Sequence, residues 1–320
     1  MTPAKRVLVS GAGGFIGRWS VPSLLGLGYD VHAVLSGNAS RDSPKELEGA
    51  TLHFADLLDA PSVAALMSET RPTHLLHFAW IATPGLYWQS AENFRWAAAS
   101  EHLLRCFGAR GGRRVLMAGS CAEYDWSRVE MCDELLSPLA DDGTAPLSPY
   151  AASKIGLQKT LADVGRREHL STAWGRIFFQ FGPYEHPDRL VPFVICNLLQ
   201  GRAAPCSHGR QIRSFLHVAD VGAAFAAVLD SALEGPVNIG SDEPVALADL
   251  VERIGRQIGR QDLVQLGARP AAAHEPPVLV PDVRRLRDEA EWRPRFTLNE
   301  ALSDTVAWWR GTLADSAGGH

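Results

Sequence analysis

The sequence predicts an α/β protein in which a doubly wound parallel sheet is followed by a smaller C-terminal α/β domain. Three observations support this fold class. Short apolar segments alternate with helical segments over roughly the first half of the chain, and a glycine-rich turn follows the first apolar segment directly. Beyond Gly182-Pro183 the segments shorten while Pro, Gly and Arg become frequent. Alternating strands and helices of this kind pack as a parallel sheet with helices on both faces.

Composition excludes several classes of protein. The 320 residues are 46% hydrophobic and 21% charged, which is typical of a globular protein. A net charge of −5 gives no electrostatic reason to expect binding to nucleic acid or to an anionic membrane. No apolar run approaches the ~20 residues of a membrane span. The five cysteines are scattered without a Cys-x-x-Cys pair, so we expect a reduced, cytoplasmic environment and no metal site.

The first strand and its turn indicate a dinucleotide site. Residues 6–10 form a β-branched run, and residues 18–27 can form a helix. Between them lies a turn whose glycines would let the backbone approach a pyrophosphate, next to the free N–H groups of the helix N-terminus. The spacing is Gly-x-x-Gly-x-x-Gly rather than the G-x-G-x-x-G form. The cofactor-binding residues that we expect in this turn are Gly11, Gly14, Phe15, Ile16 and Gly17.

The end of the second strand bears on the choice between NADP and NAD. In a dinucleotide-binding unit an acidic residue at this place accepts hydrogen bonds from the adenosine ribose. Here the strand over residues 31–35 runs into Ser36, with Arg41 a few residues further on and no carboxylate at the strand end. This favours NADP(H), whose 2′-phosphate would meet Ser36 and Arg41. NAD(H) remains possible, because a solvent-facing Arg in a polar loop would give the same pattern.

The next elements continue the alternation. Strands are expected at 51–54, 74–78, 115–118 and 171–179, and helices at 62–69, 92–107 and from the Ser148-Pro149 start to about 168. Ligands of such sheets bind at the carboxyl ends of the strands. Ser120, directly after the 115–118 strand, is therefore expected on the ligand edge.

The pair Tyr150 and Lys154 is the strongest catalytic candidate. Positions i and i+4 share one face of a helix, about 5–6 Å apart at Cβ. A neighbouring ammonium favours the phenolate and so lowers the pKa of a tyrosine toward the range useful for catalysis. The pair suits proton transfer to or from an alcohol or ketone oxygen. Taken alone, Tyr and Lys at this spacing are also common on solvated helix faces.

The division into domains is less regular in the second half. We expect residues 1–180 to form the dinucleotide-binding domain, with 212–232 returning to it. Residues 181–211 and 233–312 are expected to form the substrate-binding domain. In this half we expect short segments at 190–199 and 213–218, helices at 220–229, 248–258 and 298–309, a strand at 237–240, and a Pro-rich loop over 270–281.

Taken together, the glycine turn, Ser120 and Tyr150-x-x-x-Lys154 resemble an extended short-chain dehydrogenase/reductase, and within it the nucleotide-sugar epimerase/dehydratase branch. The resemblance covers about residues 5–310. Further matches are Asp56-Leu57, His77-Phe78-Ala79, Asn93, Arg176, Gly182-Pro183, the 209–220 segment, Asn238-Ile239-Gly240, Asp282 and Glu291-Trp292.

The resemblance implies a Rossmann domain holding NAD(P) and a C-terminal domain holding a nucleoside diphosphate sugar. It implies that Tyr150 is the acid–base, that Lys154 holds the nicotinamide ribose and that Ser120 bonds the reacting oxygen. Arg213 would meet the diphosphate of the substrate, a contact for which a guanidinium is well suited. The remaining cofactor contacts would be Asp56, Leu57, Phe78, Ala79 and Phe178, and the remaining substrate contacts Trp80, Glu123 and Val191.

Departures from the family pattern refine the expected activity. Dehydratases of this branch follow the Ser/Thr with an Asp-Glu pair, whereas Cys121 and Ala122 follow Ser120 here. Phe179 stands where an Asn that meets the sugar or its phosphates is common. Trp80, Tyr87, Trp88 and Trp126 lie in loops expected near the sugar; they suit a deoxygenated sugar, and core packing would suit them equally.

The leading hypothesis is an NADPH-dependent 4-ketoreductase of a nucleoside diphosphate 4-keto-6-deoxy sugar. The alternatives are a 4-epimerase with tightly bound NAD, a reductase of a smaller carbonyl compound, and a non-catalytic NADP-binding sensor. The resemblance also implies a homodimer formed through the helices around Asn93 and Tyr150. The apolar residues compatible with that contact, or with burial inside the monomer, are Phe94, Trp96, Leu103, Leu104 and Phe107.

Overall fold

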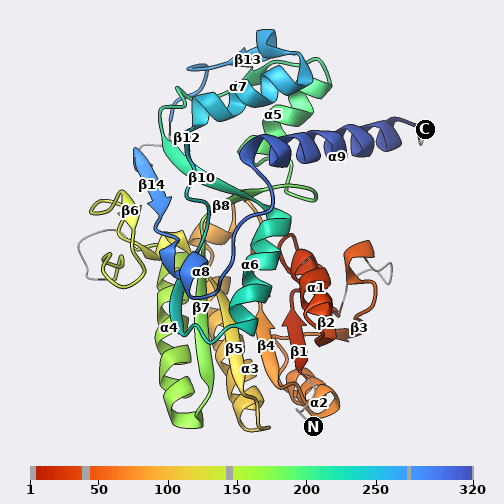
Figure 1. Cartoon of the computed structure of the whole chain (residues 1–320), viewed down its shortest axis with the longest axis vertical. Coiled ribbons are helices and arrows are strands. Elements are labelled where there is room, and N and C mark those ends of the chain that lie inside the picture. The colour runs from red at the N-terminus through yellow and green to blue at the C-terminus, as the bar shows by residue number, and fades with distance from the viewer. Residues whose placement is uncertain (1–4, 38–43, 142–146, 272–274, 319–320) are drawn as a thin grey trace.

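The computed structural model describes residues 5–37, 44–141, 147–271 and 275–318. A large parallel sheet with helices on both faces forms the lower part of the molecule in Figure 1, and a smaller group of helices and strands sits above it. The strands of the large sheet are β1 (Arg6–Ser10), β2 (Asp30–Ser36), β3 (Thr51–Ala55), β4 (His74–His77), β5 (Arg114–Ser120), β7 (Ser171–Ile177) and β11 (Gly235–Ile239).

The strand order is that of a doubly wound sheet. The strands lie in the order β11-β7-β5-β4-β1-β2-β3, and every neighbouring pair is parallel. The direction of winding reverses between β1 and β4, where the crossover connections diverge to opposite faces of the sheet. Such a reversal leaves a crevice at the carboxyl ends of the strands. The predicted fold class is confirmed.

Strand alternation explains the two cores of this sheet. Side chains of β1 alternate between its faces, so Val7 and Val9 pack on one side and Leu8 on the other. The first face is covered by α1 (Gly17–Gly26) and α6 (Val218–Asp230), which approach so closely that a Cβ on Gly222 would lie 2.4 Å from the backbone of Trp19. The second face is covered by α2 (Ala60–Thr70), α3 (Glu92–Gly108) and α4 (Pro149–Glu168).

The smaller region has its own core, built mainly from α5 (Leu190–Leu199), α7 (Leu247–Ile258) and the start of α9 (Leu298–Gly318). It joins the large sheet through a second sheet in which β10 is central. The strands of that sheet are β12 (Pro244–Ala246), β10 (Ile212–His217), β14 (Val278–Pro281), β6 (Met131–Cys132) and β8 (Phe179–Phe181). The remaining elements are β9 (Ala204–Pro205), β13 (Val264–Gln265), α8 (Arg284–Asp288), η1 (Lys45–Leu47), η2 (Tyr87–Gln89), η3 (Cys121–Glu123) and η4 (Gln261–Leu263).

Two expectations about the second half were wrong. The division at 233 assigned residues 233–312 to the smaller domain, yet β11 pairs with β7 and completes the large sheet. The Pro-rich segment expected as a loop contains β14, which pairs in parallel with β10 and with β6. Prolines are tolerated there because Pro276 and Pro277 precede the strand and Pro281 ends it.

The apolar residues of α3 divide between core and surface. Leu103, Leu104 and Phe107 are buried in the core between α3 and the sheet, whereas Phe94 is 54% exposed. Three of the residues considered for a dimer contact therefore belong to the monomer core, and the homodimer stays a prediction.

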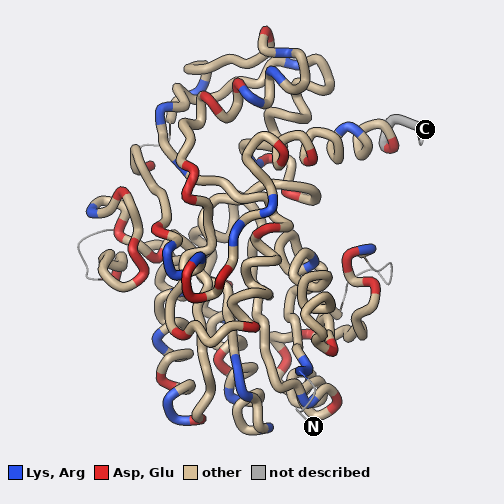
Figure 2. The backbone as a smooth tube through the Cα atoms, in the orientation of Figure 1, with Lys and Arg blue, Asp and Glu red and all other residues tan. Residues whose placement is uncertain are grey.

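Charges of both signs are intermixed along the described part of the backbone (Figure 2). Within the described ranges, no helix has the length and apolar character needed to cross a membrane.

Candidate active site

A cavity of about 780 Å³ opens at the carboxyl ends of β1, β4 and β5. It is lined by the glycine turn after β1, by the segments after β4 and β5, by the start of α4 and by residues on either side of the start of α5. Most of the predicted site residues contribute to this lining. They are Gly11, Gly14, Phe15, Ile16, Gly17, Phe78, Ala79, Trp80, Ser120, Tyr150, Lys154, Phe178, Val191 and Arg213.

The glycine turn forms a cradle that a side chain would fill. Gly11 has φ +68°, and a Cβ on it would lie 2.8 Å from the backbone nitrogen of Ala79. A Cβ on Gly17 would lie 2.2 Å from the carbonyl oxygen of Gly11. Helix α1 begins directly after the cradle and has no side-chain cap at Ile16; the N–H groups of Arg18 and Trp19 donate to the carbonyl oxygens of Gly14 and Ile16. This geometry fits a pyrophosphate held at a helix N-terminus.

Tyr150 and Lys154 are placed by the start of α4. The side-chain oxygen of Ser148 accepts a hydrogen bond from the N–H of Ala151, and Pro149 occupies the first helical position, as the sequence predicted. Lys154 Nζ donates to the carbonyl oxygen of Ala118 at 2.8 Å and lies 3.6 Å from the centroid of the Trp80 ring. Its side chain is thereby held against the end of β5.

The electrostatics of the pair differ from the expectation. Burial raises the pKa of Tyr150, and a hydrogen bond with the Ser120 side chain acts in the opposite direction. Burial lowers the pKa of Lys154 to about 7, while Glu123 acts to raise it. The lowered Tyr150 pKa expected from Lys154 is not found, because burial dominates and the ammonium faces Ala118 and Trp80 instead.

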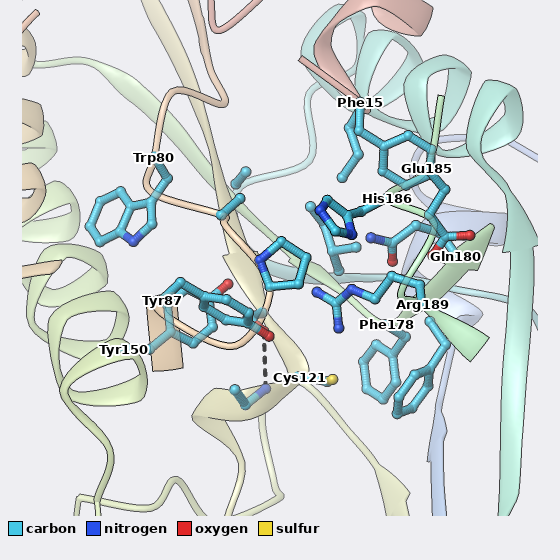
Figure 3. A pocket seen from close by; sticks show the side chains of 18 of the residues that line it. Phe15, Trp80, Tyr87, Cys121, Tyr150, Phe178, Gln180, Glu185, His186 and Arg189 are labelled. Carbon is cyan, nitrogen blue, oxygen red and sulfur yellow. Dashed lines mark hydrogen bonds between the residues drawn. The ribbon is translucent and has the colours of Figure 1, made fainter. Parts of the chain in front are cut away.

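Aromatic side chains surround Tyr150. The centroid of the Tyr87 ring lies 4.9 Å from that of Tyr150 in an edge-to-face contact, and that of Trp88 lies at 5.8 Å. Trp126 extends this wall at 5.7 Å from Trp88. Tyr87 and Tyr150 lie side by side in Figure 3, and Trp80 lies beyond them on the same side of the cavity.

Buried Asn93 holds the loop that carries Trp80, Tyr87 and Trp88. Its side-chain oxygen accepts from Trp80 Nε1 at 2.8 Å, and its amide donates to the carbonyl oxygens of Tyr87 and Ser90. The sequence placed Asn93 in a family pattern without indicating this role.

Glu123 has a different position from the one expected of a substrate contact. Its side chain is fully buried outside the cavity lining, where it pairs with Arg176 at 2.8 Å and accepts from Trp174 Nε1. Its carboxylate also accepts a hydrogen bond from the N–H of Ser120 at 2.7 Å, so Glu123 holds the backbone of Ser120 in place without lining the cavity itself. Cys121 and Ala122, which follow Ser120, line the cavity.

Other predicted cofactor contacts lie outside the lining. Ser36, Asp56 and Leu57 sit at or just beyond the carboxyl ends of β2 and β3, where Ser36 pairs in register with Ala55. Leu57 is buried, whereas Asp56 is exposed and accepts from the N–H of Leu58. Arg41 lies outside the described residues.

Sequence reasoning missed three charged residues of the lining. Glu185 and Arg189 follow Gly182-Pro183, and Glu275 precedes β14. No spacing in the sequence distinguishes them from surface residues. The only available signal was that Glu185 and Arg189 follow closely after the Gly182-Pro183 turn at the end of β8.

Comparison with known proteins agrees with this geometry. Residues 7–240 match the model of the NAD dependent epimerase/dehydratase family. The chain belongs to this family. Its members include the extended short-chain dehydrogenase/reductase enzymes that act on nucleotide sugars, and the resemblance deduced from the motifs is confirmed.

Relatives within the family carry different activities. The chain is 26% identical to dTDP-glucose 4,6-dehydratase 1 of Escherichia coli, over 95% of this chain and 92% of the relative. It is 24% identical to UDP-glucose 4-epimerase 2 of Arabidopsis thaliana, over 95% of each. The UDP-glucose 4-epimerase of Thermus thermophilus, solved with NAD, superposes with a TM-score of 0.79 at 26% identity, covering 96% of this chain and 99% of that one. A putative epimerase of Burkholderia cenocepacia gives 0.83 at 26% identity, over 97% and 100%.

Proposed function

We propose that this enzyme is an NAD(P)H-dependent 4-ketoreductase of a nucleoside diphosphate 4-keto-6-deoxy sugar. The observation that carries the proposal is a cavity that combines Ser120, Tyr150 and Lys154 with Cys121 and Ala122 in place of acids. Such a site has groups for proton transfer at a carbonyl oxygen but lacks the carboxylates that elimination of water requires at those positions.

The glycine cradle supports cofactor binding. Gly11, Gly14 and Gly17 would let the backbone approach a pyrophosphate, and Phe78, Ala79 and Phe178 line the adjoining wall. When bound, a nicotinamide cofactor would supply the hydride for the carbonyl carbon. NADPH is favoured over NADH because the end of β2 carries Ser36 rather than an acid.

Tyr150 is a suitable proton donor for the proposed reduction. Because burial raises its pKa, the phenol keeps its proton at neutral pH and can donate it to the carbonyl oxygen as the alcohol forms. Ser120, which shares a hydrogen bond with Tyr150, is placed to bond the same oxygen.

The aromatic wall also favours a reductase. An epimerase must present both faces of one sugar carbon to the same hydride donor, so the sugar has to turn over within the site. Tyr87 and Trp88 pack against Tyr150, and their rings would hinder that movement of a sugar bound beside it. Their apolar faces suit the methyl group of a 6-deoxy sugar.

The test measures cofactor use and the part played by Tyr150. The purified enzyme should oxidise NADPH when given 4-keto-6-deoxy sugar nucleotides, and NADH less well. Tyr150→Phe should lower kcat by about 10²–10⁴-fold while NADPH affinity stays within a few-fold of wild type. Stoichiometric NAD released from denatured enzyme, together with interconversion of 4-epimers, would assign the epimerase instead. Full activity in Tyr150→Phe would remove the acid–base role.

A further inference from the structure

Lys154 carries an amino group into a nearly closed part of the cavity wall. The residue is only 4% exposed, so water has little access to the ammonium. One of its three N–H donors is used by the carbonyl oxygen of Ala118, and Nζ forms no second hydrogen bond within the described ranges. An ammonium shielded from water to this degree needs a further source of stabilisation to stay charged near neutral pH.

The indole of Trp80 covers the ammonium from another side. Lys154 Nζ lies 3.6 Å from the centroid of the ring, well inside the ~6 Å over which a ring face attracts a cation. Tryptophan attracts a cation more strongly than tyrosine or phenylalanine, and the attraction grows when the cation is shielded from water. In Figure 3 the indole lies on the side of the cavity opposite Gln180 and Arg189. Its face can therefore supply the stabilisation that the hydrogen bonds of Lys154 do not.

Asn93 fixes the orientation of this indole. Asn93 is fully buried, and its amide nitrogen donates to the carbonyl oxygens of Tyr87 and Ser90. Because both N–H groups of the amide are used in this way, its oxygen accepts from Trp80 Nε1, at 2.8 Å. Turning the ring away from Lys154 would leave that buried oxygen without a donor, which costs free energy.

We propose that Trp80 is a positioning residue, whose indole face holds the Lys154 ammonium against the end of β5 and stabilises its positive charge. The catalytic consequence rests on the proposed function, because the family resemblance assigns the nicotinamide ribose to Lys154. A charged Lys154 attracts the anionic cofactor, and a neutral amine at the same place does not. Trp80 thereby has a task other than the sugar contact expected from the sequence.

Other titratable groups around Lys154 leave this task to the indole. Burial lowers the pKa of Lys154 to about 7, and the Glu123 carboxylate on η3 acts to raise it. His77 at the end of β4 is neutral, because burial and Lys154 lower its pKa to about 3. Tyr150, one turn earlier on α4, keeps its proton because burial raises its pKa. Glu123 is the charged member of these three groups, and it is already paired with Arg176.

The chain has only four lysines, so the ionisation of Lys154 can be measured directly. They are Lys5, Lys45, Lys154 and Lys159. Full-length enzyme labelled with ¹³Cε-lysine is titrated by NMR, and the loss of one resonance in Lys154→Met identifies Lys154. Trp80→Leu, which keeps an apolar side chain without a ring face, should lower the pKa of Lys154 by about one unit. Trp80→Phe, which keeps a weaker ring face, should lower it by less.

The direction of the shift separates attraction by the ring from exclusion of water. An indole that only excluded water would, when removed, admit water and raise the pKa of Lys154. An unchanged or raised pKa in Trp80→Leu would therefore overturn the inference, and so would a pKa in Trp80→Phe as low as in Trp80→Leu. If the leucine variant does not fold, an unchanged pKa in Trp80→Phe would overturn it instead.

Trp126→Leu is the matched control for these titrations. It removes an indole that lines the same cavity but packs against Trp88, so the pKa of Lys154 should stay at its wild-type value. A shift as large as that of Trp80→Leu would show that any lost indole of the cavity has the same effect, and would overturn the specific role of Trp80.

Kinetics connect the contact to the proposed reduction. Because kcat/KM for NADPH reports ionisations of the free enzyme, its fall with rising pH should move about one unit lower in Trp80→Leu. An unmoved profile beside a lowered pKa of Lys154 would overturn the catalytic part of the inference. A wild-type enzyme that never oxidises NADPH with a 4-keto sugar nucleotide would overturn the proposed function alone, because the lysine titration decides the contact without turnover.

Discussion

At the scale of single residues, Glu185 is a buried carboxyl of the cavity wall with an incomplete set of hydrogen bonds. It is 9% exposed, and its Oε2 has no hydrogen-bond partner among the described residues. Burial raises the pKa of this carboxyl from 4.5 to about 8, although Arg189 and the backbone of Gly182 act to lower it. In the unfolded chain it would ionise at its ordinary value, so folding takes up a proton between these two pH values.

This proton uptake predicts a pH-dependent penalty. Between pH 4.5 and 8 the folded state binds more protons than the unfolded state, so Glu185 lowers stability progressively as pH rises through that window. Glu185→Gln removes the effect and should gain stability relative to wild type on the order of 1 kcal/mol per pH unit. Urea unfolding at pH 5, 6, 7 and 8 measures it, with the exposed Glu243→Gln as control. Parallel profiles for Glu185→Gln and wild type would contradict the prediction.

At the scale of elements, the junction of β5, η3 and β7 holds the backbone that carries Ser120. Glu123 and Arg176 form an ion pair with both side chains buried, and Arg176 also donates to Tyr124, to Gln158 and to the carbonyl oxygen of Glu134. Breaking a buried pair from one side leaves an uncompensated charge in the core. Glu123→Ala should therefore cost about 3–5 kcal/mol of unfolding free energy.

Chemical denaturation measures this cost. Glu92→Ala, which breaks the exposed pair with Arg95 on α3, is the matched control and should cost less than about 1 kcal/mol. Double substitution of Glu123 and Arg176 by apolar residues should recover part of the loss, because neither charge is then left alone. Equal effects of Glu123→Ala and Glu92→Ala would show that the buried pair contributes no more than a surface pair.

A feature could be predicted from the sequence where its interacting residues lie close together in the chain, and not where they lie far apart. Local signals were sufficient for α4, because Ser148-Pro149 is itself the cap, and for β1, whose alternating residues face both cores. Glu123 was taken for a substrate contact because its partner Arg176 lies 53 residues away and only the fold brings them together. The pairing of Arg213 with Glu275, across 62 residues, was hidden for the same reason.

At the scale of the whole molecule, the large sheet and its core are completed only by elements from the second half of the chain. Helix α6 supplies Val221 and Phe225 to the core that also contains Val7 and Val9, and β11 adds Val237 and forms the edge beside β7. A boundary at residue 180 therefore cuts through one hydrophobic core and one sheet. Without α6 and β11, the part of that face not covered by α1, together with the edge of β7, would be exposed to water.

A fragment of residues 1–180 should consequently fail to fold as a stable domain, although it contains the glycine turn, Ser120, Tyr150 and Lys154. We expect a broad thermal transition by circular dichroism and poor dispersion in a ¹H–¹⁵N correlation spectrum, against a single sharp transition for the full chain. Residues 1–240 form the informative comparison, because that fragment restores α6 and β11 to the large sheet. It should regain part of the cooperativity while lacking α7 and α9 of the smaller core. A sharp transition in the 1–180 fragment would instead establish that the N-terminal region folds independently of α6 and β11.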